Sequence, residues 1–445
     1  MDRSEIVPAI LDRCKSLILN VLEDSSLSSV SAASLAIFQK FRDVSREILQ
    51  ACVIERFESL AAAQPEGCSC GCRSLNCVHV REVTVKTLFG DIVIKYRGFR
   101  CTGCGAYSRP DDASLGIPEE GTFSDDVRSL YQPLVAELPH RTANDIFQQF
   151  TGVDLSSRGG QSIIDSTAKD LEEWRVNREA GEVFNISSLL AQGDDLVLEV
   201  AMDGVMAHID GDWHEAKVGT ILVRRRGEQT AEGEPKLGKV EARRYACVYG
   251  GGPEELAVEI KRTIGEAGWD GIPIAEIVGD GSKWIWKLAE NHFPGVPQIL
   301  DMWHLKEHFY EFAGVHYKNP SRAKAWVQMK IDALLENRVG DVLGGLKKMK
   351  PAGKAAREAL RGLIVYVGNN SGRIRYQEPW EAGLAVGSGS VEGACKHLVQ
   401  SRFKRAGMRW KTPGFLSVVE LRAARLNGTD REFWASRGLL GRAAA

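Results

Sequence analysis

Three carboxylate residues, far apart in the sequence, are the side chains best suited to do chemistry. Asp203 and Asp280 each end a predicted strand and each precede a glycine, in AMDG and VGDG. Ligand sites in open α/β sheets gather at the carboxyl ends of strands, so the two aspartates converge if their strands are neighbours. Glu392 lies on a predicted helix that would pack across the sheet, and it supplies a third carboxylate.

Three oxygen ligands with open positions suit Mg²⁺ or Mn²⁺, hard cations that keep waters and take substrate phosphates. Two such ions about 4 Å apart would serve the displacement of a phosphodiester. Crowded carboxylates raise one another's pKa values, so cation binding would be part of such a site. A structural role stays open for each residue, because Asp-Gly is a common turn and Glu392 with Lys396 is an ordinary i,i+4 helix pair.

The Glu392 helix is also a basic segment. It is expected to begin near Ser390, with Val391, Cys395, Leu398 and Val399 on one apolar face. Its candidate phosphate-binding residues are Lys396, Arg402, Lys404, Arg405 and Arg409. The alternative is a solvated charged face. The formal net charge is -2, so any contact with nucleic acid must come from a local patch such as this one.

An α/β core is predicted to position the carboxylates. Five strands are expected at residues 195–204, 218–226, 240–251, 272–281 and 296–303. Helices are expected after the third, fourth and fifth strands, at residues 253–269, 282–293 and 304–314. The order is βββαβαβα, in which an antiparallel meander can be extended by parallel strands through helical crossovers.

The rest of the chain divides around this core. The predicted regions are 1–64 (helical), 65–112 (zinc-ribbon-like), 113–185 (helical), 186–305 (first part of the core), 306–385 (helical, without strands) and 386–445 (the Glu392 helix, one further helix and an irregular end). Residues 140–150 and 157–174 form a candidate DNA-binding helix-turn-helix, although any helical hairpin has the same pattern. A turn-rich linker, PDDASLGIP, follows residue 109.

Clustered cysteines predict a metal site in the second region. The cluster contains Cys68, Cys70, Cys72, Cys77, Cys101 and Cys104. Two cysteine knuckles joined by a hairpin around Phe89-Gly90-Asp91 would make a zinc ribbon. Cys101-x-x-Cys104 has the usual spacing, but the first knuckle contains no CxxC. Which of its cysteines bind zinc stays open, with His79 as a further candidate and unmetallated thiols as the alternative.

Composition and the first residues predict a cytosolic protein. Hydrophobic content is 44% and charged content 26%, as in ordinary globular domains. The start, MDRSEIVPAI, has an acid and a proline where a signal peptide needs a basic region and an apolar run. No apolar run is long enough to span a membrane.

Four stretches together resemble a known family: AMDGV, IVGDGSKWIW, ILDMWHLKEH and GSGSVEGACKHLVQSRFKRAGMRW. They are similar to the DDE transposases of bacterial insertion sequences, most closely the ISKra-four family. The resemblance implies an RNase H-like core with an all-helical insertion, in which Asp203, Asp280 and Glu392 are catalytic. Asp301 and His304 match a Cys/Asp-x-x-His motif, which implies active-site support or DNA-end contact. Relatives usually have CxxC in the first knuckle, where this chain departs.

The resemblance implies a metal-dependent transposase, with two Mg²⁺ or Mn²⁺ ions, that cleaves element ends and transfers their 3′-hydroxyls to target DNA. Its expected partners are the terminal inverted repeats, target DNA and a second copy or larger assembly, in a bacterial cytoplasm near the nucleoid. Two alternatives are a nuclease or resolvase on the same fold, and an inactive zinc-ribbon DNA-binding protein.

Overall fold

The computed structural model describes residues 3–24, 26–27, 29–57, 65–108, 122–178 and 195–439. The predicted linker near residue 110, the end of the first helical region at 58–64 and the beginning of the predicted core at 186–194 lie outside these ranges. The chain forms two compact units, residues 1–173 with 430–445, and residues 174–429. None of the described helices is long and apolar enough to cross a membrane.

The first unit begins with two helices, as the apolar spacing predicted. They are α1 (Arg3–Glu23) and α2 (Val30–Cys52), and α2 continues into the π-helix η1 (Val53–Phe57). Ser29, between the two helices, caps α2, since its hydroxyl accepts a hydrogen bond from the Ala32 N–H.

A three-stranded antiparallel sheet follows. Strands β1 (Leu75–Thr87) and β2 (Gly90–Cys101) pair from Leu75↔Cys101 to Thr87↔Gly90, and β3 (Tyr107–Ser108) adds to β2. The turn at Gly90, where φ is +123°, is the predicted hairpin turn. The pairing of the strand ends brings the cysteines near residue 70 to Cys101 and Cys104.

Four helices follow among the described residues of this unit. They are α4 (Asp125–Glu137), α5 (His140–Thr151), α6 (Ser157–Asn177), whose last residues belong to the second unit, and α18 (Thr429–Ser436). The predicted helix, turn and helix at 140–174 are present as α5 and α6. The expected irregular C-terminal end is instead the helix α18, because Trp434 donates a hydrogen bond to Gln132 of α4 at 2.5 Å and Arg437 pairs with Asp125 at 3.0 Å.

The second unit is built on a five-stranded mixed sheet with the order β6-β5-β4-β7-β8. The strands are β4 (Leu196–Ile209), β5 (Asp212–Arg225), β6 (Val240–Val248), β7 (Ile274–Gly279) and β8 (Gln298–Leu300). The first three form the predicted antiparallel meander, and β7 and β8 add in parallel beyond β4. The helices α8 (Pro253–Glu266), α9 (Lys283–His292) and α10 (Met302–His316) complete the predicted order βββαβαβα.

Strand β4 is longer than the sequence indicated. It was expected to end at Gly204, but it runs to Ile209 because residues beyond Gly204 stay paired with β5 until Ile209↔Asp212. Asp210 and Gly211, both with positive φ, make the tight turn. Asp203 therefore lies inside a strand and not at its end.

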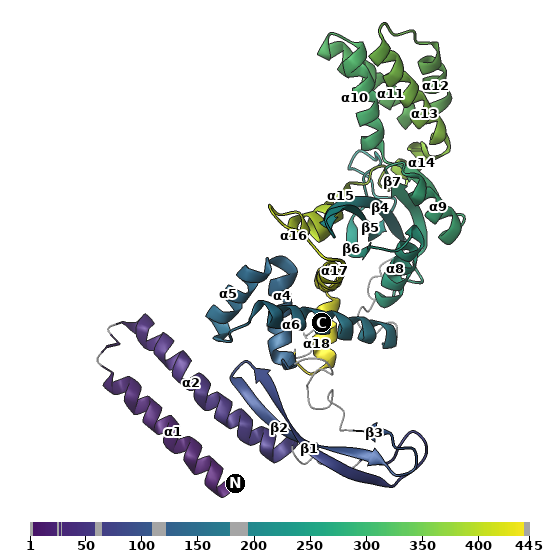
Figure 1. Ribbon diagram of the computed structural model, residues 1–445. Helices are drawn as coiled ribbons and strands as arrows, with labels where there is room; N and C mark the ends of the chain where they lie inside the picture. The colour runs from purple at the N-terminus through teal and green to yellow at the C-terminus, as the bar shows by residue number, and fades with distance from the viewer. Residues whose placement is uncertain are drawn as a thin grey trace. The chain divides into compact units, whose positions relative to one another are not determined.

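Helices continue without a strand from α10 onwards, as predicted. They are α11 (Pro320–Leu335), α12 (Val339–Lys348), α13 (Lys354–Asn369), the short η3 (Ser371–Arg373) and α14 (Gln377–Glu381). In Figure 1 the helices α10 to α13 gather into one helical group. The chain then returns to the sheet through α15 (Gly389–Ala394), the π-helix η4 (Cys395–Gln400), α16 (Ser401–Phe403) and α17 (Thr412–Asn427).

Candidate functional site

Three aspartates lie side by side on three neighbouring strands, each directly after the last residue in the parallel pairing. The parallel pairing of β4 with β7 ends at Met202↔Gly279, and that of β7 with β8 ends at Gly279↔Leu300. The next residues on the three strands are Asp203, Asp280 and Asp301. The condition stated from the sequence, that the strands carrying Asp203 and Asp280 be neighbours, is met by this pairing.

Asp203 is half-buried and interacts with its neighbours on the other strands. Burial raises the pKa of its carboxyl group, and the charge of Asp280 adds to the increase, while the Gly204 N–H and His304 oppose it. The Cys395 thiol donates a weak hydrogen bond to Asp203 Oδ2 at 3.7 Å, and burial raises the pKa of that thiol so that it stays protonated. This contact connects β4 to the segment that carries Glu392.

Asp280 is held by the first residues of the following turn. Its carboxylate accepts hydrogen bonds from the Ser282 N–H at 2.8 Å and from the Ser282 hydroxyl at 3.0 Å. Its backbone carbonyl accepts one from the Tyr366 hydroxyl, on α13, at 2.6 Å. The position of Asp280 is therefore set from both the core and the helical segment.

Asp301 is buried and caps α10. Its Oδ1 accepts hydrogen bonds from the N–H groups of Trp303 at 2.5 Å and His304 at 3.2 Å. Its Oδ2 accepts from both the N–H and the hydroxyl of Ser388, and lies 3.4 Å from His304 Nδ1. These bonds hold the pKa of Asp301 below its usual range, against the effect of burial. The hydrogen bond that the His304 ring donates to the Asp301 carboxylate raises the pKa of His304 to about 9.

Glu392 lies on α15 with an exposed side chain. It forms an i,i+4 ion pair with Lys396 at 2.7 Å. This pair is the structural role that the sequence left open as the alternative to metal binding. Among the described residues, the only group of three or more Cys, His, Asp or Glu ligand atoms within 4.8 Å of one another is a cysteine cluster. Asp203, Asp280 and Glu392 are thus not gathered to that distance here.

The helix around Glu392 differs in two ways from the prediction. It begins at Gly389 with Ser388 at the N-cap, not at Ser390, and the Ser388 hydroxyl donates to Asp301 and does not cap the helix. From Cys395 it continues as a π-helix, a form that often occurs at functional sites. The apolar face is as expected, since Val391, Cys395, Leu398 and Val399 are all buried.

The predicted phosphate-binding residues separate into two groups. Lys396, Lys404, Arg405 and Arg409 are exposed. Arg402 is only 1% exposed, and its guanidinium packs 4.9 Å from the centre of the Trp410 ring. The expectation that Arg402 binds a phosphate is therefore wrong for this conformation. The i,i+3 and i,i+4 spacing around η4 turns it inward with Leu398 and Val399.

Four cysteines form the cluster in the first unit, Cys68, Cys70, Cys101 and Cys104. Cys68 Sγ lies 3.4 Å from Cys104 Sγ, and Cys70 Sγ lies 3.6 Å from Cys101 Sγ. Tetrahedral zinc with bonds of about 2.3 Å places its sulfur ligands roughly 3.8 Å apart, so this group could hold a structural zinc ion. The first knuckle supplies its pair as Cys-x-Cys.

The other candidate ligands point elsewhere. The Cys72 thiol lies 3.7 Å from the Thr102 hydroxyl, and the Cys77 thiol donates to the His79 carbonyl at 3.8 Å. The His79 ring is hydrogen-bonded to Tyr107 at 3.1 Å. Within the cluster, the Cys70 N–H and the Cys104 thiol lower the pKa of Cys68 to about 7. A thiolate, the form that binds metal, is therefore accessible near neutral pH.

Comparison with known proteins bears on the second unit. Residues 210–435, just over half of the 445 residues, match the uncharacterised protein family UPF0236. The chain belongs to UPF0236. In this UPF0236 protein the matched range contains Asp280, Asp301 and Glu392 and begins shortly after Asp203. No curated protein matches the chain.

Three residues of this UPF0236 site were missed by sequence reasoning. Ser388 binds Asp301, Cys395 contacts Asp203, and Tyr366 bonds to the Asp280 carbonyl. Ser388 lies in the Gly-Ser-Gly-Ser sequence at 387–390 and Cys395 on the apolar face of the helix, where local patterns assign only a structural role. Tyr366 is 86 residues from Asp280, and the sequence carries no signal of their contact.

Proposed function

We propose that the protein is a DDE-type DNA transposase with an RNase H-like core. The observation that carries the proposal is the pairing of β4 with β7, which sets Asp203 beside Asp280 at one sheet edge. The strand order β6-β5-β4-β7-β8 and the helical segment from α10 to α14 support the same interpretation. The motif resemblance supplies the reaction class, and membership of UPF0236 is compatible with it.

The two aspartates fit a divalent cation. Both are half-buried, and neither forms an ion pair with a described lysine or arginine. Two adjacent carboxylates without a lysine or arginine partner, and with only the His304 side chain as a nearby positive charge, are an arrangement that a hard cation relieves. Bound Mg²⁺ or Mn²⁺ would stabilise charge on the attacking and leaving oxygens of a phosphodiester.

Glu392 would complete the site by changing its side-chain rotamer. It belongs to the helix whose Cys395 contacts Asp203, and its carboxylate is exposed, with Lys396 as its one ion-pair partner among the described residues. An exposed ion pair of this kind is worth at most about 1 kcal/mol, so its loss is a small cost. The hydrogen bonds from Ser388 to Asp301 would hold the start of this helix over the strand ends.

The reaction would have two phosphoryl transfers. In the first, water attacks a phosphorus at the element end, and the bond to the 3′-oxygen breaks to leave a 3′-hydroxyl and a 5′-phosphate. In the second, this 3′-hydroxyl attacks a target phosphorus, forming a new phosphodiester and releasing a target 3′-hydroxyl. Lys396, Lys404, Arg405 and Arg409 would neutralise backbone phosphates. Joining two ends requires two copies of the chain or more.

The test is cleavage of a labelled duplex that carries the DNA flanking the coding sequence, in Mg²⁺. Wild type is compared with Asp203→Asn and Glu392→Gln, which keep side-chain size and remove a charge. Glu358→Gln is the matched control, because Glu358 is also an exposed helix glutamate with a lysine four residues away, at 3.9 Å.

We expect both site variants to bind the duplex and to lose cleavage by at least about 100-fold, with the control unchanged. Joining of labelled 3′ ends to a plasmid separates transposition from simple cutting. Cleavage without any joined product would support the nuclease alternative. Full cleavage by Asp203→Asn would contradict the site itself.

A further inference from the structure

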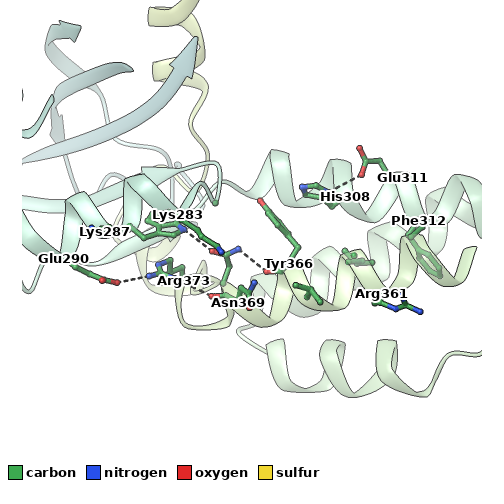
Figure 2. A pocket seen from close by; sticks show the side chains of 17 residues that line it. Lys283, Lys287, Glu290, His308, Glu311, Phe312, Arg361, Tyr366, Asn369 and Arg373 are labelled. Atoms are coloured by element: carbon green, nitrogen blue, oxygen red, sulfur yellow. Dashed lines mark hydrogen bonds and ion pairs between the residues drawn. The ribbon is translucent and has the colours of Figure 1, made fainter. Parts of the chain in front are cut away.

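A groove of about 940 Å³ lies between the core and the helical segment. Its walls come from α9, α10 and α13, and its lining includes Lys283, Trp286, Lys287, Arg361, Tyr366 and Arg373. Figure 2 shows the lysines of α9 on one side and Tyr366 and Arg361 of α13 on another. A groove of this size lies at the upper end of small-ligand sites, roughly 300–1,000 Å³, and has room for a few nucleotides but not for a duplex.

One end of the groove adjoins Asp280. Gly281, the next residue, is part of the lining, and the Tyr366 hydroxyl that bonds to the Asp280 carbonyl belongs to the opposite wall. Gly281 has φ +101°, and a Cβ there would lie 2.9 Å from the Tyr366 hydroxyl oxygen. Only glycine therefore lets α13 approach the chain so closely at this point, directly after Asp280. We call the row formed by Asp203, Asp280 and Asp301 the carboxylate edge, and the groove begins beside it.

The groove carries cations that no carboxylate neutralises. Lys283 and Lys287 lie one turn apart on α9, Arg361 lies on α13, and none of the three forms an ion pair with another described residue. By contrast, Arg373 is bound to Glu290 at 3.0 Å, and His308 to Glu311 at 3.2 Å. Three free cations around one groove favour an anionic ligand with several charges.

The floor between these cations is aromatic and apolar. The His308 and Tyr366 rings are in contact, with centres 4.1 Å apart. Trp286 is fixed by its hydrogen bond to Asn370 at 3.1 Å and by Arg373 stacked at 4.7 Å. Phosphate-binding cations around aromatic surfaces are the combination that binds single-stranded nucleic acid, because unpaired bases offer free faces for stacking.

We propose that this groove binds a single DNA strand that leaves the carboxylate edge at Asp280. Its phosphates contact Lys283, Lys287 and Arg361, and its bases lie against Tyr366 and His308. The assignment of the strand to DNA rests on the proposed function, whereas the binding of an unpaired strand rests on the groove itself.

The experiment measures binding of a fluorescent oligothymidylate of about 12 residues to the full chain, by anisotropy at several salt concentrations. The test variant is Lys283→Ala/Lys287→Ala/Arg361→Ala. Its matched control is Lys347→Ala/Lys348→Ala/Arg357→Ala, which removes three exposed charges from α12 and α13 outside the groove.

We expect the test variant to bind at least about tenfold more weakly, with a salt slope smaller by about 2, as for three lost single-strand phosphate contacts. The control should match wild type within about twofold. An abasic strand of equal length should bind wild type about tenfold more weakly, since it lacks stacking. Equal binding by the test and control variants would overturn the proposal.

A second measurement does not depend on the variants. Ultraviolet cross-linking of an iodouracil-substituted strand to wild type should attach to peptides containing His308 or Tyr366, and attachment only elsewhere would contradict the groove. An RNA strand that binds more tightly than DNA would overturn the assignment to DNA. Strand binding in the groove without metal-dependent cleavage would contradict the proposed function and support the binding site. Metal-dependent cleavage without strand binding in the groove would support the proposed function and contradict the binding site.

Discussion

Asp301 Oδ2 accepts a hydrogen bond from the Ser388 N–H at 2.8 Å, and this bond joins the end of strand β8 to the turn before Glu392. The same carboxyl group caps α10 and lies beside His304. One buried side chain thus connects the sheet edge, the first helix of the helical segment and the start of the Glu392 helix. Ser388, its partner in the Glu392 segment, is 87 residues away in the sequence.

Replacing Asp301 with asparagine should impair the site without abolishing DNA binding. The asparagine amide nitrogen cannot accept the hydrogen bonds from Ser388, so the turn before Glu392 loses its fixed position. Loss of a positioning contact of this kind commonly costs 10- to 100-fold, and we expect about that loss of cleavage. Ser388→Ala keeps the N–H bond and should lose less. Unimpaired cleavage by Asp301→Asn would argue that the bond has no positioning role.

The same variant should change the titration of His304. The folded-state pKa is raised to about 9 by the Asp301 hydrogen bond, so the stability that this pair contributes is present below about pH 6.5 and is lost as pH rises through about 9. In Asp301→Asn the pKa should fall toward 6.5, and the stability deficit of the variant should shrink over that pH window. Imidazole NMR titration and denaturation at both pH limits measure the two effects.

Zinc content should depend on four cysteines and not on their neighbours. Wild type, Cys72→Ser and Cys77→Ser should each hold about one zinc per chain, whereas Cys68→Ser and Cys101→Ser should lose most of it, because a structural site needs four ligands. Atomic emission on protein purified without chelator provides the measurement. Retention of zinc by Cys101→Ser together with its loss in Cys72→Ser would mean that the knuckle uses a different pair.

Glu276 should make the protein less stable as pH rises. It is 1% exposed on β7, opposite Glu199, which is paired with Arg224 at 2.7 Å. Burial, then the charge of Glu199, raises the pKa of Glu276 well above its usual range. Between the unfolded and folded pKa values the folded state binds more protons, so its free energy of unfolding falls with rising pH.

Glu276→Gln keeps the shape and removes this titration. We expect a smaller difference in unfolding free energy between about pH 5 and about pH 8 for this variant than for wild type. The exposed Glu358→Gln variant should behave as wild type. An identical pH dependence for Glu276→Gln and wild type would show that Glu276 keeps its normal protonation in the folded protein.

Arg402 should contribute to the stability of the fold, and Arg409 to the binding of DNA. Arg402→Ala removes buried packing against Trp410 and should lower the free energy of unfolding by about 2 kcal/mol. Arg409→Ala lies on the surface and should leave stability unchanged while weakening duplex binding at low salt. Urea denaturation and a binding titration on both variants separate the two. An unchanged free energy of unfolding in Arg402→Ala would contradict the buried packing role and favour the expectation from the sequence that Arg402 binds a phosphate.

Local patterns in the sequence were sufficient for the order of the strands and helices in the core, although not for the helix α18 or for the full length of β4. The alternation and helical spacing of apolar residues gave βββαβαβα, the cysteine hairpin and the buried face at Val391 and Leu398, because burial on one face repeats with the period of the element itself. The Asp-Gly pairs marked the acidic positions that the parallel strands align. What these carboxylates do chemically stays a prediction of the sequence and its resemblance.

Contacts between distant segments were decided only by the tertiary structure. The pairing of β5 with β4 extends β4 past Asp203, and the hairpin brings Cys68 and Cys70, rather than Cys72, to Cys101 and Cys104. The clamp between Asp301 and Ser388 is of the same kind. Each depends on which surfaces meet when remote elements pack. A sequence pattern records the period of burial within one element but not the partner that buries it.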